Sequence, residues 1–291
     1  MRRGLRAAQH GLVAVAVIYL LVPVAVVVLF SLQQAKRTGL PFEGPSLRWF
    51  DLIVSDENFR SALTSTLKVA FGAAVTATTI ALLGTLATAR GMVRRPGLAR
   101  TAGLAPLVVP PVFIGFSLLL TFGEIGWTPS LLTVYLAHVL VTTPLAWAVL
   151  QARFSRFDFS VEEAARDLGA GVLMTFWRVT LPLTWRALVG AAMIVFAFSV
   201  DEFVVTLFVV GPDDTLPVLV WSRLRRSIDP SINAIATILL IVVLASAFLA
   251  WLLLRTRKGG LGEEQATPGD PGSLVPSLQR AERREEESVH V

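Results

Sequence analysis

Residues 161–183, VEEAARDLGAGVLMTFWRVTLPL, form a charged, glycine-containing segment between two long apolar runs. The chain around it has 291 residues, of which 54% are hydrophobic and only 16% are charged. Since a soluble chain carries about a quarter charged residues, this composition indicates a membrane protein. The segment is therefore predicted to be a loop that leaves the membrane.

Six apolar windows flank this segment or precede it, and each is long enough for a membrane-spanning helix, which needs about 20 residues. They cover residues 11–32, 61–89, 101–122, 131–150, 186–210 and 232–254. The predicted fold is all-α: a polytopic membrane protein with six transmembrane helices. Pro106, Pro110 and Pro111 predict a bend or break in the third helix, because proline removes a backbone donor. Such a break fits either a covered cavity or a simple packing kink.

Arginine and lysine residues predict the orientation, because cytoplasmic loops carry the excess of them. With the N-terminus inside, most of the Lys and Arg residues between the predicted helices fall on the inner side. Both termini are therefore predicted to be cytoplasmic, and residues 161–183 lie in the second cytoplasmic loop. The first apolar run lacks a clear small-residue cleavage site, so an uncleaved signal-anchor is favoured over a removed signal peptide.

Three regions follow one another along the chain. Residues 1–60 hold the signal-anchor helix and an outer loop, residues 61–258 the transmembrane core with a cytoplasmic loop at 151–185, and residues 259–291 a tail. The tail is rich in Gly, Pro and acidic residues, which predicts disorder. The net charge of +5 reflects the basic residues that set the orientation, so nucleic-acid binding is rejected. Cysteine is absent, and no carboxylate pair, Ser/His/Asp order or metal spacing stands out, so we assign neither catalysis nor a metal.

The first part of the charged segment is predicted to be a short surface helix. Ser160 and Glu163 have the spacing of a capping box. Glu162 and Arg166 are four residues apart with the acid first, the better order for a pair on one helix face. Gly169 supplies a stop signal for the helix.

A second helical stretch is expected over residues 172–179, closed by Pro182 before the fifth membrane helix. Ala164 and Ala165 leave one side of the first helix almost bare, so another backbone could approach it. The loop is also much longer than two membrane helices need to be joined. We interpret the segment as a handle for another protein. The alternative is that Glu163 is only a cap and the helix only a solvated connector.

The spacing of this segment resembles a known signature. Glu163-Ala164-Ala165 is followed after three residues by Gly169, and after nine more by Val179-Thr180-Leu181-Pro182. This pattern is similar to the EAA motif of inner-membrane permease subunits of binding-protein-dependent ABC importers, whose last part reads I-x-L-P. Val179 stands where that family has isoleucine. The likeness covers roughly residues 61–254.

The resemblance implies the MetI-like permease core and a set of partners. These are cytoplasmic ATP-binding subunits, expected to be two, a second homologous permease subunit and an extracytoplasmic solute-binding protein, all at the bacterial inner membrane. ATP and Mg would be used by the ATPase, and this chain would bind no cofactor. The sequence agrees in lacking a G-x-x-x-x-G-K-[ST] phosphate loop.

The resemblance also implies which residues couple the chain to the ATPase. The helix would enter a cleft of that subunit, with Glu163 as a charged anchor, Gly169 as the sharp turn and Pro182 as the fixed exit toward the membrane. The full set implied is Glu163, Ala164, Ala165, Gly169, Leu181 and Pro182.

Within the family, the chain is most similar to the spermidine/putrescine branch, in particular its PotC-type permeases. The matching pieces are Gly211-Pro212, Leu216-Pro217, Ser222, Pro230, Asn233-Ala234 and Ala236-Thr237. The departures are Trp221 in place of a tyrosine and Asp201-Glu202 in place of two aspartates. This likeness implies a small cationic cargo of the polyamine type. Related permeases serve phosphonates, opines or ferric ion, and an ion-coupled secondary transporter is a further alternative.

Three ionisable residues lie inside predicted membrane helices: Lys68, Asp201 and Glu202. A charge at mid-bilayer costs at least about 2.5 kcal/mol and marks a transport path or a buried partner. Lys68 and Asp201 have similar predicted depths, so an ion pair of Lys68 with Asp201 or Glu202 is one hypothesis. The other is that the acids face the path of a cation. For His138, a helix-to-helix hydrogen bond is favoured over a proton relay.

Overall fold

The computed structural model describes residues 2–226 and 229–255. Over these residues the secondary structure is helical, apart from one isolated bridge between Gln33 and Pro45. Residues Met1–Trp251 form one compact unit. The predicted tail at 259–291 lies outside the described residues.

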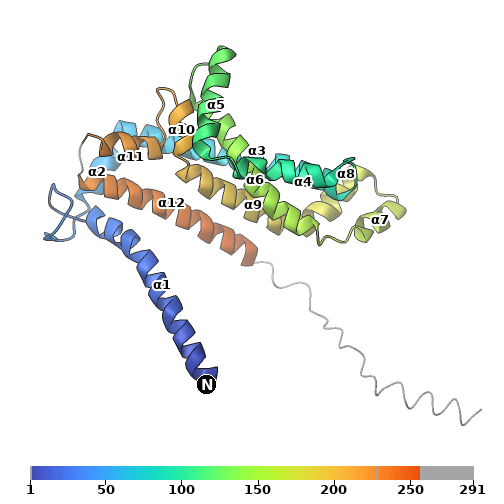
Figure 1. Cartoon of the computed structure of the whole chain (residues 1–291), viewed down its shortest axis with the longest axis horizontal. Coiled ribbons are helices and arrows are strands. Elements are labelled where there is room, and N and C mark those ends of the chain that lie inside the picture. Colours follow the sequence, from blue (N-terminus) through green and yellow to red (C-terminus); the bar gives the residue numbers. More distant parts are fainter. Residues whose placement is uncertain (1, 227–228, 256–291) are drawn as a thin grey trace, which may run out of the picture. The chain divides into compact units, whose positions relative to one another are not determined.

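Long helices make up most of the described chain (Figure 1). They are α1 (Arg2–Ser31), α3 (Glu57–Ala89), α5 (Pro111–Glu124), α6 (Leu131–Phe154), α9 (Leu181–Asp201) and α12 (Pro230–Arg255). Shorter elements connect them: α2 (Arg48–Ser55), α4 (Pro96–Leu104), η1 (Ala105–Leu107), α7 (Ser160–Asp167), α8 (Val172–Thr175), the π-helical turn η2 (Phe176–Thr180), α10 (Val204–Val209) and α11 (Leu216–Leu224).

Five continuous helical stretches are long and apolar enough to cross a membrane, and a bent pair brings the number to six. The pair consists of Pro96–Leu107 and Pro111–Glu124, whose axes differ by 93°. The break falls where Pro110 adopts an extended conformation and Pro111 begins the next helix. The predicted interruption of the third membrane helix is therefore confirmed, with the prolines as its cause.

The fifth membrane helix is not the single helix over 186–210 that the sequence predicts. It ends at Asp201, and α10 begins at Val204. Glu202 has an extended backbone, with φ −69° and ψ 111°, and its carboxylate accepts a hydrogen bond from the Val205 N–H at 2.8 Å. An acidic side chain thus satisfies a free donor at the start of α10, which lets the helix stop and restart.

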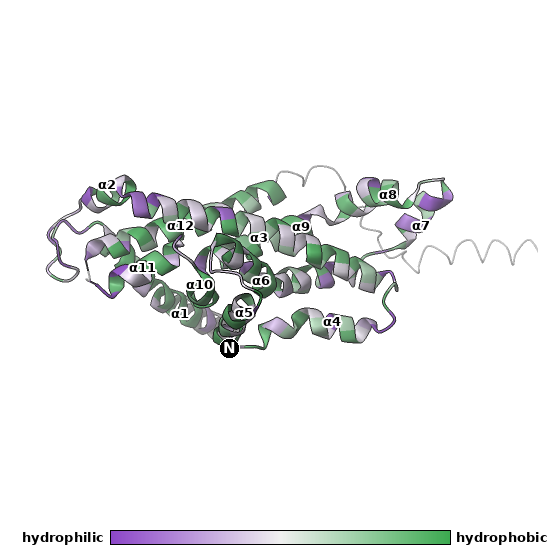
Figure 2. Ribbon diagram, turned by 90° about the horizontal axis from the view of Figure 1, so that it is seen from above, coloured by the Kyte–Doolittle hydropathy of each residue, from purple (hydrophilic) through white to green (hydrophobic). Residues whose placement is uncertain are grey.

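The core of the bundle is the packing of α3 against α6 and α9. One face of α3 carries small side chains that let these helices approach closely. The fully buried alanines on this face are Ala70, Ala73, Ala77 and Ala81. Figures 1 and 2 show α7 and α8 at one end of the bundle and α2 and α11 at the other.

The end that carries α2 and α11 is held by polar contacts. The buried Gln33 side chain donates to the carbonyls of Gly39 and Pro41 and accepts from the Glu43 N–H, which orders the loop after α1. At the start of α3, Asp56 caps the helix and forms an ion pair with Arg223 of α11. By contrast, the apolar side chains of α1 are largely exposed, as expected for a helix that faces lipid or another subunit.

Candidate coupling and translocation sites

Helix α7 begins differently from the sequence prediction. Ser160 is already its first residue, and the residue before it, Phe159, makes no side-chain cap. The acceptor for the Ser160 N–H is Asp158, whose carboxylate lies 3.0 Å away. The predicted capping box between Ser160 and Glu163 is therefore wrong, because Ser160 lies inside the helix and its N–H already has an acceptor in the Asp158 carboxylate, which leaves Glu163 free of that role.

The neighbouring Glu162 is the buried acid of this helix, with only 2% of its surface exposed. Its Oε1 accepts from Arg90 at 2.8 Å and from the Thr180 hydroxyl at 2.6 Å. The predicted pair with Arg166 is present at 3.7 Å, through Oε2. Burial raises the pKa of Glu162, but the hydrogen bonds from Arg90 and Thr180 outweigh it and hold the pKa below its usual range.

Sequence reasoning missed this role of Glu162 because it gave the weight to Glu163. Arg90 is 72 residues away along the chain, so no local spacing relates the two. The available signal was indirect: two adjacent acids on a short helix face different directions, so one of them can be buried while the other meets solvent.

The other residues of the signature present an open surface. Glu163 and Ala164 are exposed and Ala165 is half-buried. Gly169 has φ +89°, a conformation that side chains rarely adopt, and it ends the helix as predicted. Its N–H donates to the Arg166 carbonyl, and the next N–H donates to the Ala165 carbonyl, which together form a Schellman motif.

After this turn the helix does not stop at Pro182, contrary to the sequence prediction. A helical path runs from Val172 to Asp201, and Pro182 lies in the first turn of α9. The π turn before it makes this continuity feasible: the Leu181 N–H donates to the Phe176 carbonyl, five residues back. A helix that widens here avoids the clash that proline otherwise causes with the preceding turn.

The end of the bundle formed by α7, α8 and η2 exposes large apolar side chains beside the exposed Glu163. We call this set the tip surface. It consists of Glu163, Leu168, Val172, Leu173 and Trp177, with Leu168 90% exposed. Several large apolar side chains exposed on the short elements at one end of a bundle are typical of a protein interface rather than of a solvated connector.

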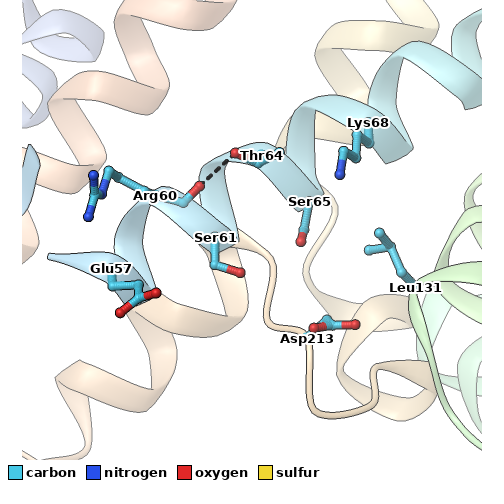
Figure 3. A pocket seen from close by; sticks show the side chains of 8 residues that line it. All are labelled: Glu57, Arg60, Ser61, Thr64, Ser65, Lys68, Leu131 and Asp213. Atoms are coloured by element: carbon cyan, nitrogen blue, oxygen red, sulfur yellow. Dashed lines mark hydrogen bonds between the residues drawn. The ribbon is translucent and has the colours of Figure 1, made fainter.

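Lys68 lines an open cavity of about 540 Å³ near the other end of α3. In Figure 3, Lys68 and Asp213 both point toward this space, one from α3 and the other from the loop after α10. All lining residues except Leu131 are polar or charged: Glu57, Arg60, Ser61, Thr64, Ser65, Lys68 and Asp213. The cavity therefore offers both signs of charge to a solute.

The hypothesis of an ion pair between Lys68 and the acids of the fifth helix is not supported. Lys68 is exposed and forms no ion pair with any residue of 2–226 or 229–255. Asp201 is exposed and lines a different cavity, and Glu202 is buried with its carboxylate on the Val205 N–H. The helix ends between the two acids, so they point to different environments.

The cavity that contains Asp201 has a volume of about 300 Å³ and is otherwise mostly apolar. It is lined by Asp201, Phe203, Pro217, Val220, Trp221, Leu224, Ala236 and Leu239. The rings of Phe203 and Trp221 lie 5.4 Å apart, and the Arg225 guanidinium lies 4.8 Å from the Trp221 ring. A carboxylate beside an aromatic face that already holds a cation is an arrangement suited to organic cations.

His138 is fully enclosed between helices. Its Nδ1 lies 2.6 Å from the Ser199 hydroxyl of α9, and its Nε2 lies 2.7 Å from the Thr206 hydroxyl of α10. The predicted helix-to-helix hydrogen bond is confirmed. The histidine links the two sides of the break at Glu202 and holds them in one arrangement.

A comparison with protein families matches residues 80–258 to the binding-protein-dependent transport system inner membrane component. The chain belongs to this family. As a permease of this kind it is a transport subunit rather than an enzyme. The matched range contains the tip surface, the Asp201 cavity and His138.

Individual relatives extend the match over most of the permease. The putrescine transport system permease protein PotI of Escherichia coli K12 is 38% identical over 248 residues, covering 81% of this chain and 86% of that protein. The spermidine/putrescine transport system permease protein PotC of the same strain is 27% identical, covering 89% and 98%. A bacterial alginate ABC transporter, solved with a periplasmic protein carrying an alginate pentasaccharide, shares the fold at a TM-score of 0.65 and 15% identity, covering 86% and 93%.

Proposed function

We propose that this permease carries a small organic cation of the polyamine type inward, in a complex driven by ATP. The observation that carries the proposal is the cavity that joins Asp201 to two aromatic rings. The likeness to permeases named for putrescine and spermidine supports the same cargo class.

The chemistry of this cavity fits an alkyl diamine. The carboxylate of Asp201 supplies a negative charge, and the face of Trp221 supplies a cation–π contact of about 0.5–2 kcal/mol. Val220 and Leu239 provide apolar surface for the methylene chain. Arg225 lies on the Trp221 ring in this structure, so an arriving ammonium would replace it there.

Lys68 has a different role in this proposal. We place it on the translocation path, at a point separate from the Asp201 cavity. It lines the mixed-charge cavity near the far end of α3, which Glu57 and Asp213 also line. A lysine opposes a bound cation, so we propose that this cavity passes the solute on rather than holding it. Glu202, which is buried against backbone, shapes the break in the helix and does not contact the solute.

The tip surface is the proposed contact with the ATPase. Glu163 and Ala164 are exposed, Gly169 turns the chain sharply, and Leu181 and Pro182 carry the helix back toward the membrane. In this arrangement both termini are cytoplasmic, two ATP-binding subunits dock from inside, a second permease completes the pore, and a binding protein delivers the solute from outside. ATP and Mg would be bound by the ATP-binding subunits.

Reconstitution tests the proposal. The chain is assembled in vesicles with its ATPase, second permease and binding protein, and uptake of putrescine, spermidine, ferric ion, a phosphonate and an opine is compared. ATP-dependent uptake of a polyamine is expected, and Asp201→Asn should reduce it at least tenfold. Glu124→Gln, which removes an exposed acid at the end of α5, is the matched control and should transport normally.

Other outcomes assign a different function. ATP-dependent uptake of ferric ion, a phosphonate or an opine without polyamine uptake would contradict the cargo class. Uptake by the chain alone, driven by a proton or sodium gradient, would contradict the dependence on ATP. The tip surface is tested separately by Glu163→Lys, which should reduce the amount of ATPase that copurifies with the permease.

A further inference from the structure

The carboxylate of Glu162 joins three elements that are distant in sequence. It belongs to α7, it accepts from Arg90 at the end of α3, and it accepts from Thr180 in the last position of η2. Arg90 also lies 3.5 Å from the Thr180 hydroxyl, so the three side chains form a closed triangle. We call this triangle the α3–α7 joint.

The joint is buried, whereas the chain that follows α7 is not. Thr180 has no exposed surface and Glu162 has 2%. In the turn between α7 and α8, Gly169 and Gly171 are exposed and have open space where a side chain would be. A glycine-containing exposed turn is a compliant connection, and a buried charge-assisted contact with two donors is a stiff one.

We propose that Glu162 and Arg90 are positioning residues that transmit movement of the tip surface to α3. This inference rests on the proposed function, in which the tip surface is moved by the ATPase. Helix α3 is the element through which the movement would reach the solute. It packs against α6 and α9, and its other end carries Lys68 and the mixed-charge cavity, about 33 Å away at 1.5 Å per residue.

The anchoring of Arg90 explains why this residue can transmit movement. Its backbone caps α3, because the Arg90 N–H donates a hydrogen bond to the Leu86 carbonyl. Gly91 then turns the chain away with φ +69°. The side chain of Arg90 reaches Glu162 directly from the rigid end of a long helix. A pull or push on α7 therefore acts along α3, in addition to any path through η2 into α9.

The test measures solute molecules taken up per ATP hydrolysed in the complete reconstituted complex. Arg90→Gln should leave the ATPase bound, because the tip surface is unchanged, while uptake per ATP falls at least fivefold. Arg94→Gln is the matched control, since Arg94 is an exposed residue between α3 and α4 and makes no contact with Glu162. Equal uptake per ATP in Arg90→Gln and the parent would overturn the inference.

A covalent bridge provides a second measurement, in which one variant is compared with itself before and after linking. The chain has no cysteine, so Arg90→Cys and Glu162→Cys can be combined and linked with a short bifunctional thiol reagent. Uptake per ATP should be low before linking and should recover after it. If a linked complex that still hydrolyses ATP shows no recovery of uptake per ATP, the inference is also overturned.

The two claims fail in different ways. If the parent complex shows no ATP-dependent uptake, the proposed function is contradicted before any variant is compared. If the parent transports and Arg90→Gln couples normally, only the role of the joint is contradicted. Arg90→Lys, which keeps the charge with a shorter reach, should recover part of the coupling lost in Arg90→Gln.

Discussion

A glycine-to-alanine change at Gly84 gives the sharpest test of how closely α3 and α6 pack. A Cβ at this position would overlap the outer ring of Trp147, well inside van der Waals contact. The ring has little freedom to retreat, because its other part lies against Gly103 of α4, where a Cβ would be 2.6 Å from Cε2. The ring therefore fills the space between two helices that approach it only because both carry glycine.

The cost follows from this geometry. Adding a methylene-sized group to a well-packed core costs about 1–3 kcal/mol, and a ring held on both sides places Gly84→Ala near the upper end, at about 3 kcal/mol. For a chain of 291 residues, that corresponds to a fall in the midpoint of thermal unfolding of about 5 °C. The unfolding is followed in lipid nanodiscs by tryptophan fluorescence.

A matched control and a double variant make this prediction specific. Gly190→Ala in α9 adds the same group where nothing lies within 4 Å, so it should be neutral or stabilise by up to about 1 kcal/mol. Trp147→Phe removes the outer ring, so the double variant with Gly84→Ala should lose less than the two single variants together. The packing argument is wrong if Gly84→Ala unfolds at the same temperature as Gly190→Ala, or if the two effects simply add.

Three further changes test the contacts of Glu162, the turn at Gly169 and the hydrogen bonds of His138. Because the Arg90 and Thr180 bonds keep the pKa of Glu162 below the usual 4.5, the stability they provide is present above that pH and is lost as the pH falls through the folded-state pKa. The difference in unfolding temperature between the parent and Glu162→Gln should therefore be largest near pH 7 and shrink below pH 4.5; a constant difference would argue against the ion pair. Gly169→Ala places a side chain at φ +89° and should cost about 1–2 kcal/mol and weaken copurification of the ATPase, whereas Gly171→Ala, at φ −68°, should not. His138→Phe leaves the buried Ser199 hydroxyl without its ring partner, whereas Thr206 still donates to the Glu202 carbonyl, and it should destabilise the chain by about 1–3 kcal/mol in thermal unfolding. His138→Gln should partly reverse this loss; equal loss in both variants would contradict the hydrogen-bonding role.

The membrane helices were predictable because the thickness of the bilayer sets the length of a spanning helix, and an apolar run of that length can be recognised in the sequence. The proline-induced break in the third helix was predictable for a similar reason, since the missing donor is a property of the residue itself. The end of α7 at Gly169 followed from local chemistry as well. These features depend on residues within a few positions of one another, which is the range over which sequence patterns are informative.

The features that were wrongly predicted or missed depend on distant or competing contacts. Pro182 was expected to end a helix, but the π turn before it relieves the clash. The capping box failed because Asp158, two residues before Ser160, supplied the acceptor first. Lys68 and Asp201 have similar depth, yet depth does not determine which way a side chain faces, and each lines its own cavity. The bond between Arg90 and Glu162 spans 72 residues, beyond any local pattern.

The interruption of the fifth membrane helix accounts for how two adjacent acids come to do different work. In an unbroken helix both carboxylates would need partners inside the membrane, at a cost of several kcal/mol if either lacked one. The stop at Asp201 frees backbone donors at the start of α10, and Glu202 satisfies one of them. The same stop leaves Asp201 at a helix end beside Phe203 and Trp221, with its charge open to a cavity. The break therefore gives the buried acid a hydrogen-bond partner and leaves the other acid exposed, so restoring a continuous helix should remove both the cap and the proposed cation site.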